Sequence, residues 1–389
     1  MLDRQIETEL NILRNEFPVI AVLGPRQSGK TTLSKKVFSN YEYVSFEDYD
    51  VREFAENDPR GFLGRYSENI IFDEIQRSPE IISYLQTHVD QHRGNGKIII
   101  TGSHNFLLME QISQSLAGRV GITKLLPFSI KEIEQLNIER DEMIFNGLYP
   151  RIYDQGIRAG LFHKNYISTY IEKDIRQIKK ITRLDVFIRF MKLLAGRTGQ
   201  ELNLSSLGEE CGISHNTVLE WISVLEASFI VYRLKPFHKN YNKRLVKRSK
   251  VYFTDTGLVC SLLGIRNKEE LDYHFLKGSI FETFIVSEIL KADYNTGESF
   301  EMYYWRDNHK KEIDLIIDAG RKQLGIEIKS SGTVSEKYFD GLKYWKGLTE
   351  TDSENLYLIY GGTENMKRNG MNVISWDNVF DGIVKSILA

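Results

Sequence analysis

Three observations predict a mixed α/β fold for this chain. Residues 19–126 alternate helical segments with short apolar runs of the kind found in buried parallel strands. A glycine-rich turn separates the first apolar run from the first helix. The last third of the chain, from residue 255, again combines helices with apolar strands, some of which carry charged side chains. We therefore expect two α/β units joined by a helical middle region.

Composition limits the class of protein. The chain has 389 residues, of which 41% are hydrophobic and 27% charged, and its net charge is −2. These values are typical of a globular protein of about two or three domains. Nucleic acid binding would need a local basic patch, because no global field attracts phosphate. Cys211 and Cys260 have no metal-ligand spacing, and the start is polar. We expect a cytoplasmic protein that neither enters a membrane nor carries a signal peptide.

The glycine-rich turn fits the G-x-x-x-x-G-K-[ST] phosphate loop without a mismatch. It follows the apolar run 19–23 and precedes a predicted helix at 32–38, whose N-terminus would face the phosphates. In such a loop Lys30 reaches the β- and γ-phosphates and the Thr31 hydroxyl holds Mg²⁺. The expected ligands are ATP and Mg²⁺. The predicted binding residues are Gly24, Pro25, Arg26, Gln27, Ser28, Gly29, Lys30, Thr31, Thr32 and Asp73.

The next strands end in polar residues at the same edge of the predicted parallel sheet. Strands are predicted at 41–46, 69–72 and 97–103, and a helix at 78–92. Ligands of such sheets bind at the carboxyl ends of the strands, where Asp73, Glu74 and Ser103 fall. We expect Asp73 and Thr31 to hold Mg²⁺, and Glu74 to polarise the attacking water. The alternative is a pair of acids at a strand end with no catalytic role.

This segment resembles the AAA+ ATPases, and more closely a prokaryotic group of P-loop ATPases with the sequences GPRQxGKTTL and DEIQ, here Asp73–Gln76. The resemblance implies that Ser103 senses the γ-phosphate. It also implies that Arg119, in the sequence SLAGR, is an arginine finger acting on a neighbouring subunit, and hence a homo-oligomer. An ion pair within the chain is the alternative for Arg119, and Arg26 is a rival finger. The predicted catalytic residues are Lys30, Glu74, Ser103 and Arg119.

The middle of the chain predicts a helical region followed by a winged helix. A boundary is expected near Pro150, and helices are expected at 162–179 and 183–194. Residues 199–254 then have the order helix, turn, helix, strand, basic loop and strand. The loop 238–250 contains six Lys or Arg and no acid, which favours contact with the DNA backbone. The second helix has no Lys or Arg, so sequence readout is not expected. The loop could instead dock on an acidic domain or be solvated.

The last region carries a group of charged residues on predicted strands. Strands are expected at 303–305, 313–317 and 324–329, after a helix at 278–291. Glu327 and Lys329 lie two apart and so point to one face. With Asp314 and the helix residue Glu282 they resemble the PD-(D/E)xK nuclease superfamily, and the same arrangement ends the ATPase group named above. The resemblance implies a second Mg²⁺ or Mn²⁺ on Glu282, Asp314 and Glu327, with Lys329 orienting water. A strand-edge ion pair is the alternative.

Together these patterns predict a Mg²⁺-dependent ATP hydrolase in which nucleotide state controls how the distal parts meet DNA or another partner. The expected parts are an ATPase domain (1–150), a helical lid or linker (151–198), a winged helix (199–254) and a restriction-endonuclease-like α/β domain (255–389). Two alternatives stay open: an ATP-gated, metal-dependent nuclease, and a switch that assembles on nucleotide without hydrolysis. A metabolic kinase lacks support, because no motif for a small-substrate pocket occurs.

Overall fold

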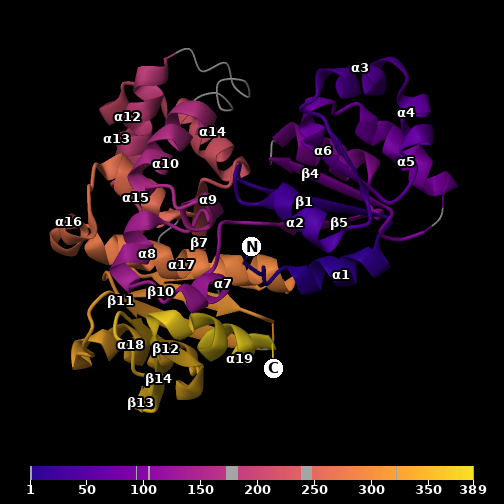
Figure 1. Cartoon of the computed structure of the whole chain (residues 1–389). Coiled ribbons are helices and arrows are strands. Elements are labelled where there is room, and N and C mark those ends of the chain that lie inside the picture. Colours follow the sequence, from indigo (N-terminus) through magenta and orange to yellow (C-terminus); the bar gives the residue numbers. More distant parts are fainter. Residues whose placement is uncertain are drawn as a thin grey trace.

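The chain is described by a computed structural model that covers residues 2–92, 94–103, 106–171, 183–237, 248–298, 300–320 and 322–388. Two sheets organise the fold, one of five strands and one of nine. Figure 1 shows the five-stranded sheet and its helices, in indigo and purple, set beside a larger body that contains the rest of the chain.

The five-stranded sheet is entirely parallel and has the order β2-β3-β4-β1-β5. Because β1 lies between β4 and β5, the chain leaves it toward one edge of the sheet and later returns to its other side. The elements of this part are α1 (Glu7–Glu16), β1 (Val19–Gly24), α2 (Lys30–Val37), β2 (Glu42–Ser45), α3 (Tyr49–Asn57), α4 (Pro59–Arg65), β3 (Ile70–Asp73), η1 (Ile75–Arg77), α5 (Ile81–Gln91), β4 (Ile98–Ser103), α6 (Phe106–Ser115) and β5 (Val120–Lys124).

Both faces of this sheet are buried, which explains why its strands are apolar throughout. In β1, Ile20 and Val22 face a core shared with Leu10 of α1 and Leu33 of α2. The alternate residues of β1 face the larger core, where α4, α5 and α6 pack. Side chains alternate between the faces of a strand, so a strand covered on both sides needs apolar residues at every position. The phosphate-loop sequence therefore starts from a rigid, central strand.

The middle part is mainly helical and ends in an antiparallel hairpin. The strands β7 and β8 pair with each other, and the two-residue strand β6 pairs with β8. The elements are α7 (Ile130–Ile133), η2 (Glu134–Leu136), α8 (Arg140–Asn146), α9 (Pro150–Asp154), α10 (Ala159–Tyr166), η3 (Ile167–Ile171), α12 (Leu184–Ala195), β6 (Gln200–Glu201), α13 (Leu204–Cys211), α14 (His215–Ala227), β7 (Val231–Pro236), β8 (Lys250–Phe253), α15 (Thr256–Leu263) and α16 (Lys268–Tyr273).

The last part completes the nine-stranded sheet, whose order is β13-β14-β12-β11-β10-β9-β7-β8-β6. The long helix α17 packs on β8 and β11 of this sheet and also contacts α1 and β5 of the first part. The elements are α17 (Lys277–Thr296), β9 (Glu301–Arg306), β10 (Glu312–Asp318), β11 (Gln323–Lys329), η4 (Glu336–Phe339), α18 (Asp340–Thr349), η5 (Ser353–Asn355), β12 (Leu356–Tyr360), β13 (Met366–Arg368), β14 (Met371–Ser375), η6 (Trp376–Asn378), η7 (Phe380–Val384) and α19 (Lys385–Leu388).

The hairpin of the middle part is joined to this last sheet. Strand β7 pairs in parallel with β9 through Lys235 opposite Tyr303 and Pro236 opposite Tyr304. The boundary expected at 254/255 therefore falls within one continuous sheet. The sequence of elements α13, α14, β7 and β8 matches the predicted order of a winged helix, and the Ser214 side chain caps α14 by accepting a hydrogen bond from Thr217 N at 3.1 Å. Most of the predicted basic loop, residues 238–247, lies outside the described residues.

No helix in the described ranges combines the length and the apolar character that a membrane crossing requires.

Candidate functional site

The phosphate-loop sequence connects the carboxyl end of β1 to the first turn of α2. A Cβ on Gly24 would lie 2.1 Å from the Leu125 carbonyl oxygen, so only glycine fits this close approach. Gly29, just before α2, has φ of 95°, a left-handed conformation that glycine adopts without strain. The Lys30 side chain is buried and its Nζ donates to the carbonyl oxygens of Gly24, at 3.1 Å, and Pro25, at 2.9 Å. The ammonium group is thus held against its own loop.

Three hydroxyl groups converge on the Asp73 carboxylate at the end of β3. Thr31 Oγ1 lies 3.0 and 3.1 Å from the two carboxylate oxygens, and the Tyr43 hydroxyl donates to Oδ2 at 2.7 Å. Thr101 of β4 donates to Oδ1. Burial, followed by the hydrogen bond to Asp73, raises the pKa of Tyr43 above its ordinary value, so it stays a donor. The sequence predicted that Thr31 and Asp73 meet, but not the parts taken by Tyr43 and Thr101.

Glu74 follows Asp73 in a left-handed backbone conformation, with φ of 57°. Non-glycine residues in this conformation occur mainly where the surrounding structure holds them there, often at functional sites. The side-chain amide of Gln76 donates to Glu74 and, at 3.0 Å, to the Ser103 hydroxyl. Gln76 therefore links the two strand ends that the sequence predicted to be catalytic. Its own role was not predicted, although it lies in the DEIQ sequence.

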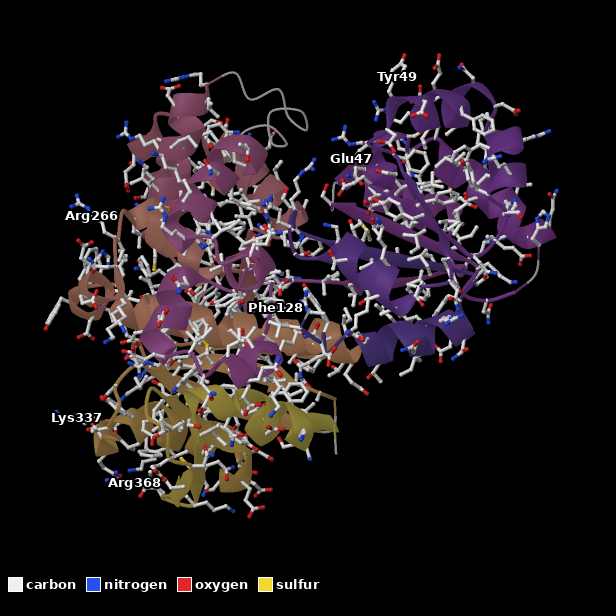
Figure 2. The ribbon with its side chains drawn as sticks, in the orientation of Figure 1. Glu47, Tyr49, Phe128, Arg266, Lys337 and Arg368 are labelled. Carbon is white, nitrogen blue, oxygen red and sulfur yellow. The ribbon has the colours of Figure 1, made fainter. Side chains whose placement is uncertain are left out.

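A cavity of about 310 Å³ opens over the loop. Of the predicted binding residues, Gln27, Gly29, Lys30, Thr31 and Thr32 line it, as does Glu74. The other wall comes from distant segments that local sequence reasoning missed. Figure 2 shows one of these residues, Phe128, at the junction between the first part and the rest of the chain. The unpredicted lining residues are Leu2, Arg4, Leu33, Lys36, Phe128, Pro150, Arg151, Asp154 and Gln155.

The two arginines considered as fingers lie in different places. Arg119 precedes β5, where its carbonyl oxygen accepts a hydrogen bond from Val19 N at the amino end of β1. The phosphate loop follows the other end of β1, about 16 Å along the strand. Arg119 forms a two-pronged ion pair with Asp90, at 2.7 and 2.9 Å, which is the alternative considered from the sequence. Arg26 lies within the loop itself and is half-buried. Action of Arg119 on a neighbouring subunit stays a prediction.

The four charged residues predicted in the last part come together on β10, β11 and α17. Lys329 Nζ lies 2.6 Å from Glu327 Oε1 and 3.2 Å from Asp314 Oδ2, and Asp314 Oδ2 also accepts from Ile328 N at 2.8 Å. Burial and then the nearby Asp314 charge raise the pKa of Glu327 to about 8, although Lys329 acts in the opposite direction. The predicted common face of Glu327 and Lys329 is confirmed.

A second lysine, which the sequence did not single out, meets the fourth predicted residue. Lys250 of β8 places its buried Nζ 3.0 Å from Glu282 Oε1 and 2.5 Å from Glu312 Oε1. Burial alone would lower the pKa of Lys250, but these carboxylates raise it overall. Two ammonium groups thus compensate the buried acids. Among the described residues, no three His, Cys, Asp or Glu side chains are grouped so as to hold a metal ion. The second metal site stays a prediction without support from this geometry.

Three family models match successive parts of the chain. Residues 16–134 match a family described as an AAA domain. Residues 137–269 and 277–379 match two families that are each described as a domain of unknown function. The first match covers the phosphate loop and all five strands of the parallel sheet. The second runs across the lid and hairpin as one unit and extends beyond the expected boundary at 254.

Several proteins of known sequence or structure are similar to the chain. The uncharacterized protein Rv2008c of Mycobacterium tuberculosis is 29% identical over 336 residues, covering 85% of this chain and 75% of that protein. The uncharacterized protein MJ1544 of Methanocaldococcus jannaschii is 23% identical, covering 93% and 86%. The structure of a Walker-type ATPase of Pyrococcus abyssi is 13% identical, covering 67% and 96%, with a TM-score of 0.44. AMPPCP-bound DnaA of Aquifex aeolicus is 15% identical, covering 57% and 85%, with a TM-score of 0.29.

The two structural similarities are too low to support an assignment, so the family match carries it. An AAA domain match over 16–134 coincides with a phosphate loop, a parallel sheet and a cavity over the loop. This combination supports nucleotide binding and an ATPase-type hydrolase activity at the general level. The first part of this chain is similar to the AAA-type P-loop ATPases.

Proposed function

We propose that the protein is a Mg²⁺-dependent ATP hydrolase whose nucleotide state controls the distal parts of the chain. The observation that carries this proposal is the contact between the Thr31 hydroxyl and the Asp73 carboxylate, at 3.0 Å, beside a cavity of about 310 Å³ that Lys30 lines. A hydroxyl from the loop and a carboxylate from the third strand are the donors that hold Mg²⁺ in P-loop ATPases.

The donor set fits magnesium and a triphosphate. Mg²⁺ prefers oxygen ligands and keeps several waters, so one hydroxyl, one carboxylate and phosphate oxygens suffice. Asp73 and Thr31 are the residues that would hold it, and bound Mg²⁺ would offset charge on the phosphates. The cavity volume is within the range of small-molecule sites, about 300–1,000 Å³. The buried Lys30 ammonium supplies the positive charge that a polyphosphate requires in such a site.

The remaining roles follow from the positions of the polar side chains. Glu74 polarises the attacking water, because it is the carboxylate next to the proposed Mg²⁺ ligand. Ser103 senses the γ-phosphate from the end of the neighbouring strand. The backbone amides of the loop hold the phosphates, and the segment around Phe128 with α9 shields them from water. Arg119 acts only across a subunit boundary, in a homo-oligomer.

Replacing Gln76 with alanine is expected to lower the ATP turnover rate by roughly 10- to 100-fold while leaving the dissociation constant for ATP within about twofold. The reason is that Gln76 holds both the Glu74 carboxylate and the Ser103 hydroxyl. Steady-state turnover and calorimetric binding measure the two quantities. The matched control is Gln91→Ala, an exposed position on α5. An unchanged turnover rate in Gln76→Ala would mean that Glu74 is oriented without this amide.

We further propose that α17 transmits the nucleotide state to the distal parts. This helix contacts α1 and β5 on one side and β8 and β11 on the other, and it carries Glu282. Any motion of the first part relative to the last must therefore involve it. The partner is DNA, bound through the basic loop 238–250, or another macromolecule. The deciding experiment is the ATPase rate with Mg²⁺, measured alone, with single-stranded DNA and with double-stranded DNA. No ATP turnover under any of these conditions would leave only the non-hydrolysing switch.

A metal-dependent nuclease is the second candidate, favoured by the contacts of Lys329 with Asp314 and Glu327. If it is correct, the protein nicks supercoiled plasmid in Mn²⁺ or Mg²⁺, and Asp314→Asn lowers the nicking rate by at least about 100-fold, because a metal ligand is lost. Gel electrophoresis measures the product. Asp318→Asn, on the same strand, is the matched control and should cleave normally. Wild-type protein that leaves every plasmid intact would rule this candidate out.

A further inference from the structure

Arg4 makes three polar contacts to separate parts of the chain. Its Nη1 donates to the Ser28 carbonyl oxygen at 2.9 Å, and its Nη2 donates to the Leu126 carbonyl oxygen at 2.7 Å. Its Nε lies 3.0 Å from Glu132 Oε2. The residue is only 8% exposed. Because the guanidinium donors have fixed directions, three partners of this kind set the orientation of the whole group.

The contact with Ser28 acts on the phosphate loop itself. Ser28 and Gly29 share a trans peptide, in which the C=O and the N–H point in opposite directions. Holding the Ser28 oxygen toward Arg4 therefore turns the Gly29 N–H away from it. Loop amides of this kind are the groups that bind phosphate. Arg4 also lines the cavity over the loop. It thus fixes one of the peptides on which the predicted grip on the triphosphate depends.

Glu132 in turn fixes Arg4. One of its oxygens accepts from Gln5 N at 2.7 Å, and the other accepts from Ser129 N at 2.9 Å as part of a capping box at α7. Glu132 is 6% exposed, so both charges of the Arg4–Glu132 pair are removed from water. In a buried pair, loss of one partner leaves the other charge uncompensated. The guanidinium is therefore held in one position by a carboxylate that is itself immobile.

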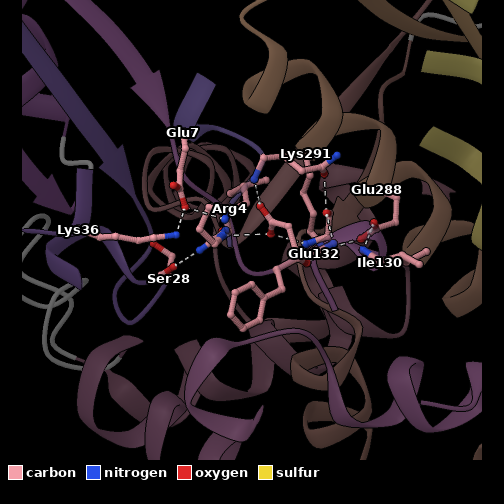
Figure 3. Close-up of polar contacts among 12 residues, drawn as sticks. Arg4, Glu7, Ser28, Lys36, Ile130, Glu132, Glu288 and Lys291 are labelled. Carbon is pink, nitrogen blue, oxygen red and sulfur yellow. Dashed lines mark hydrogen bonds and ion pairs between the residues drawn. The ribbon is translucent and has the colours of Figure 1, made fainter. Parts of the chain in front are cut away.

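The segment 126–132, which Arg4 holds from one side, is held by α17 from the other. Figure 3 shows these contacts together. Ile130 N donates to Glu288 Oε2 at 2.7 Å, and Lys291 Nζ donates to the Phe128 carbonyl oxygen at 2.8 Å. Lys291 also pairs with Glu288, at 2.6 Å. The phosphate loop is thereby connected through buried polar contacts to the helix that carries Glu282.

We propose that Arg4 is a positioning residue for the bound triphosphate, fixing the Ser28–Gly29 peptide of the phosphate loop from a base that Glu132 and the segment 126–132 provide. This inference rests on the proposed binding of ATP at the loop. It deepens that proposal, because it makes affinity for the triphosphate depend on the packing of α17 against segment 126–132.

The test is Arg4→Lys in the full chain, with Mg-ATP binding measured by calorimetry and turnover measured alongside. Lysine keeps the charge beside Glu132 but cannot donate in fixed directions to two carbonyl groups. We expect the dissociation constant and KM for ATP to rise about tenfold, with kcat changed by less than about threefold. Arg14→Lys, on the exposed side of α1, is the matched control and should bind ATP like the wild type.

Glu132→Gln provides a second variant that keeps the shape of the capping side chain. It should raise KM for ATP in the same direction, and combining it with Arg4→Lys should give less than the product of the two effects, because both act on one guanidinium. Normal ATP affinity in Arg4→Lys, with or without a lower melting temperature, would overturn the inference and leave Arg4 a purely structural residue. Wild-type protein that binds no ATP would instead overturn the proposed function itself.

Discussion

Replacing Lys30 with alanine is expected to abolish detectable ATP binding, with the dissociation constant for Mg-ATP rising by at least about 100-fold. The Lys30 ammonium is buried beside the cavity and is held 3.1 and 2.9 Å from the carbonyl oxygens of Gly24 and Pro25. In a site from which water is largely excluded, charge-assisted hydrogen bonds to phosphate are stronger than in water. Alanine leaves the loop without its positive charge. Isothermal titration calorimetry with Mg-ATP measures the loss.

The matched control is Lys97→Ala. Lys97 lies at the amino end of the same parallel sheet, where it pairs with Glu68 on the surface, and it does not line the cavity over the loop. It should bind ATP with the wild-type affinity. The melting temperature of Lys30→Ala should stay close to that of the wild type in the absence of nucleotide. If this variant is folded and still binds ATP normally, the nucleotide does not bind at the phosphate loop.

Replacing Glu74 with glutamine is expected to lower the ATP turnover rate by about 10²–10⁴-fold while preserving ATP binding. Glutamine has nearly the same shape as glutamate but cannot accept a proton from water. Glu74 directly follows Asp73, the proposed Mg²⁺ ligand, so the lost function is removal of the proton and not the hold on the metal. The contact with Gln76 keeps the side chain in place. Single-turnover hydrolysis and calorimetry, run on one preparation, separate the two quantities.

Glu80→Gln is the control for this variant, because Glu80 is exposed just before α5 and should be silent in both measurements. The Glu74→Gln protein should also remain in its ATP-bound form for longer, which size-exclusion chromatography with labelled ATP detects. Wild-type turnover by Glu74→Gln would place the water-activating base elsewhere.

The nucleotide site divides into a part that was predictable and a part that was not. The sequence predicted the phosphate loop, the strand before it and the meeting of Thr31 with Asp73, and the structure confirms that meeting at 3.0 Å. The reason is that a parallel strand, a tight turn and a helix N-terminus follow from residues that are neighbours in sequence. The carboxyl ends of parallel strands also share one edge, so Asp73, Glu74 and Ser103 could be grouped before their partners were known.

The C-terminal cluster shows the same division. The spacing of Glu327 and Lys329 predicted their common face, since side chains alternate along a strand, and the 2.6 Å contact confirms it. Lys250 could not be predicted to join them, because its strand β8 belongs to a hairpin that enters the sheet only through the pairing of β7 with β9. That pairing also makes one sheet of two parts that composition had suggested were separate. Its Lys250 contacts compensate Glu282, which was expected to face a metal.

What the sequence determined by itself is therefore the local chemistry: a phosphate loop, a pair of acids at a strand end and a parallel sheet beneath them. The tertiary structure alone decided which distant residues close the cavity and hold the loop. Arg4 is 122 positions from Leu126, yet both lie against the loop, and no feature near Arg4 in the sequence marks it. Contacts of this kind depend on how α1, the segment 126–132 and α17 pack together. Packing is a property of the whole chain, whereas turns and strand ends are set by a few adjacent residues.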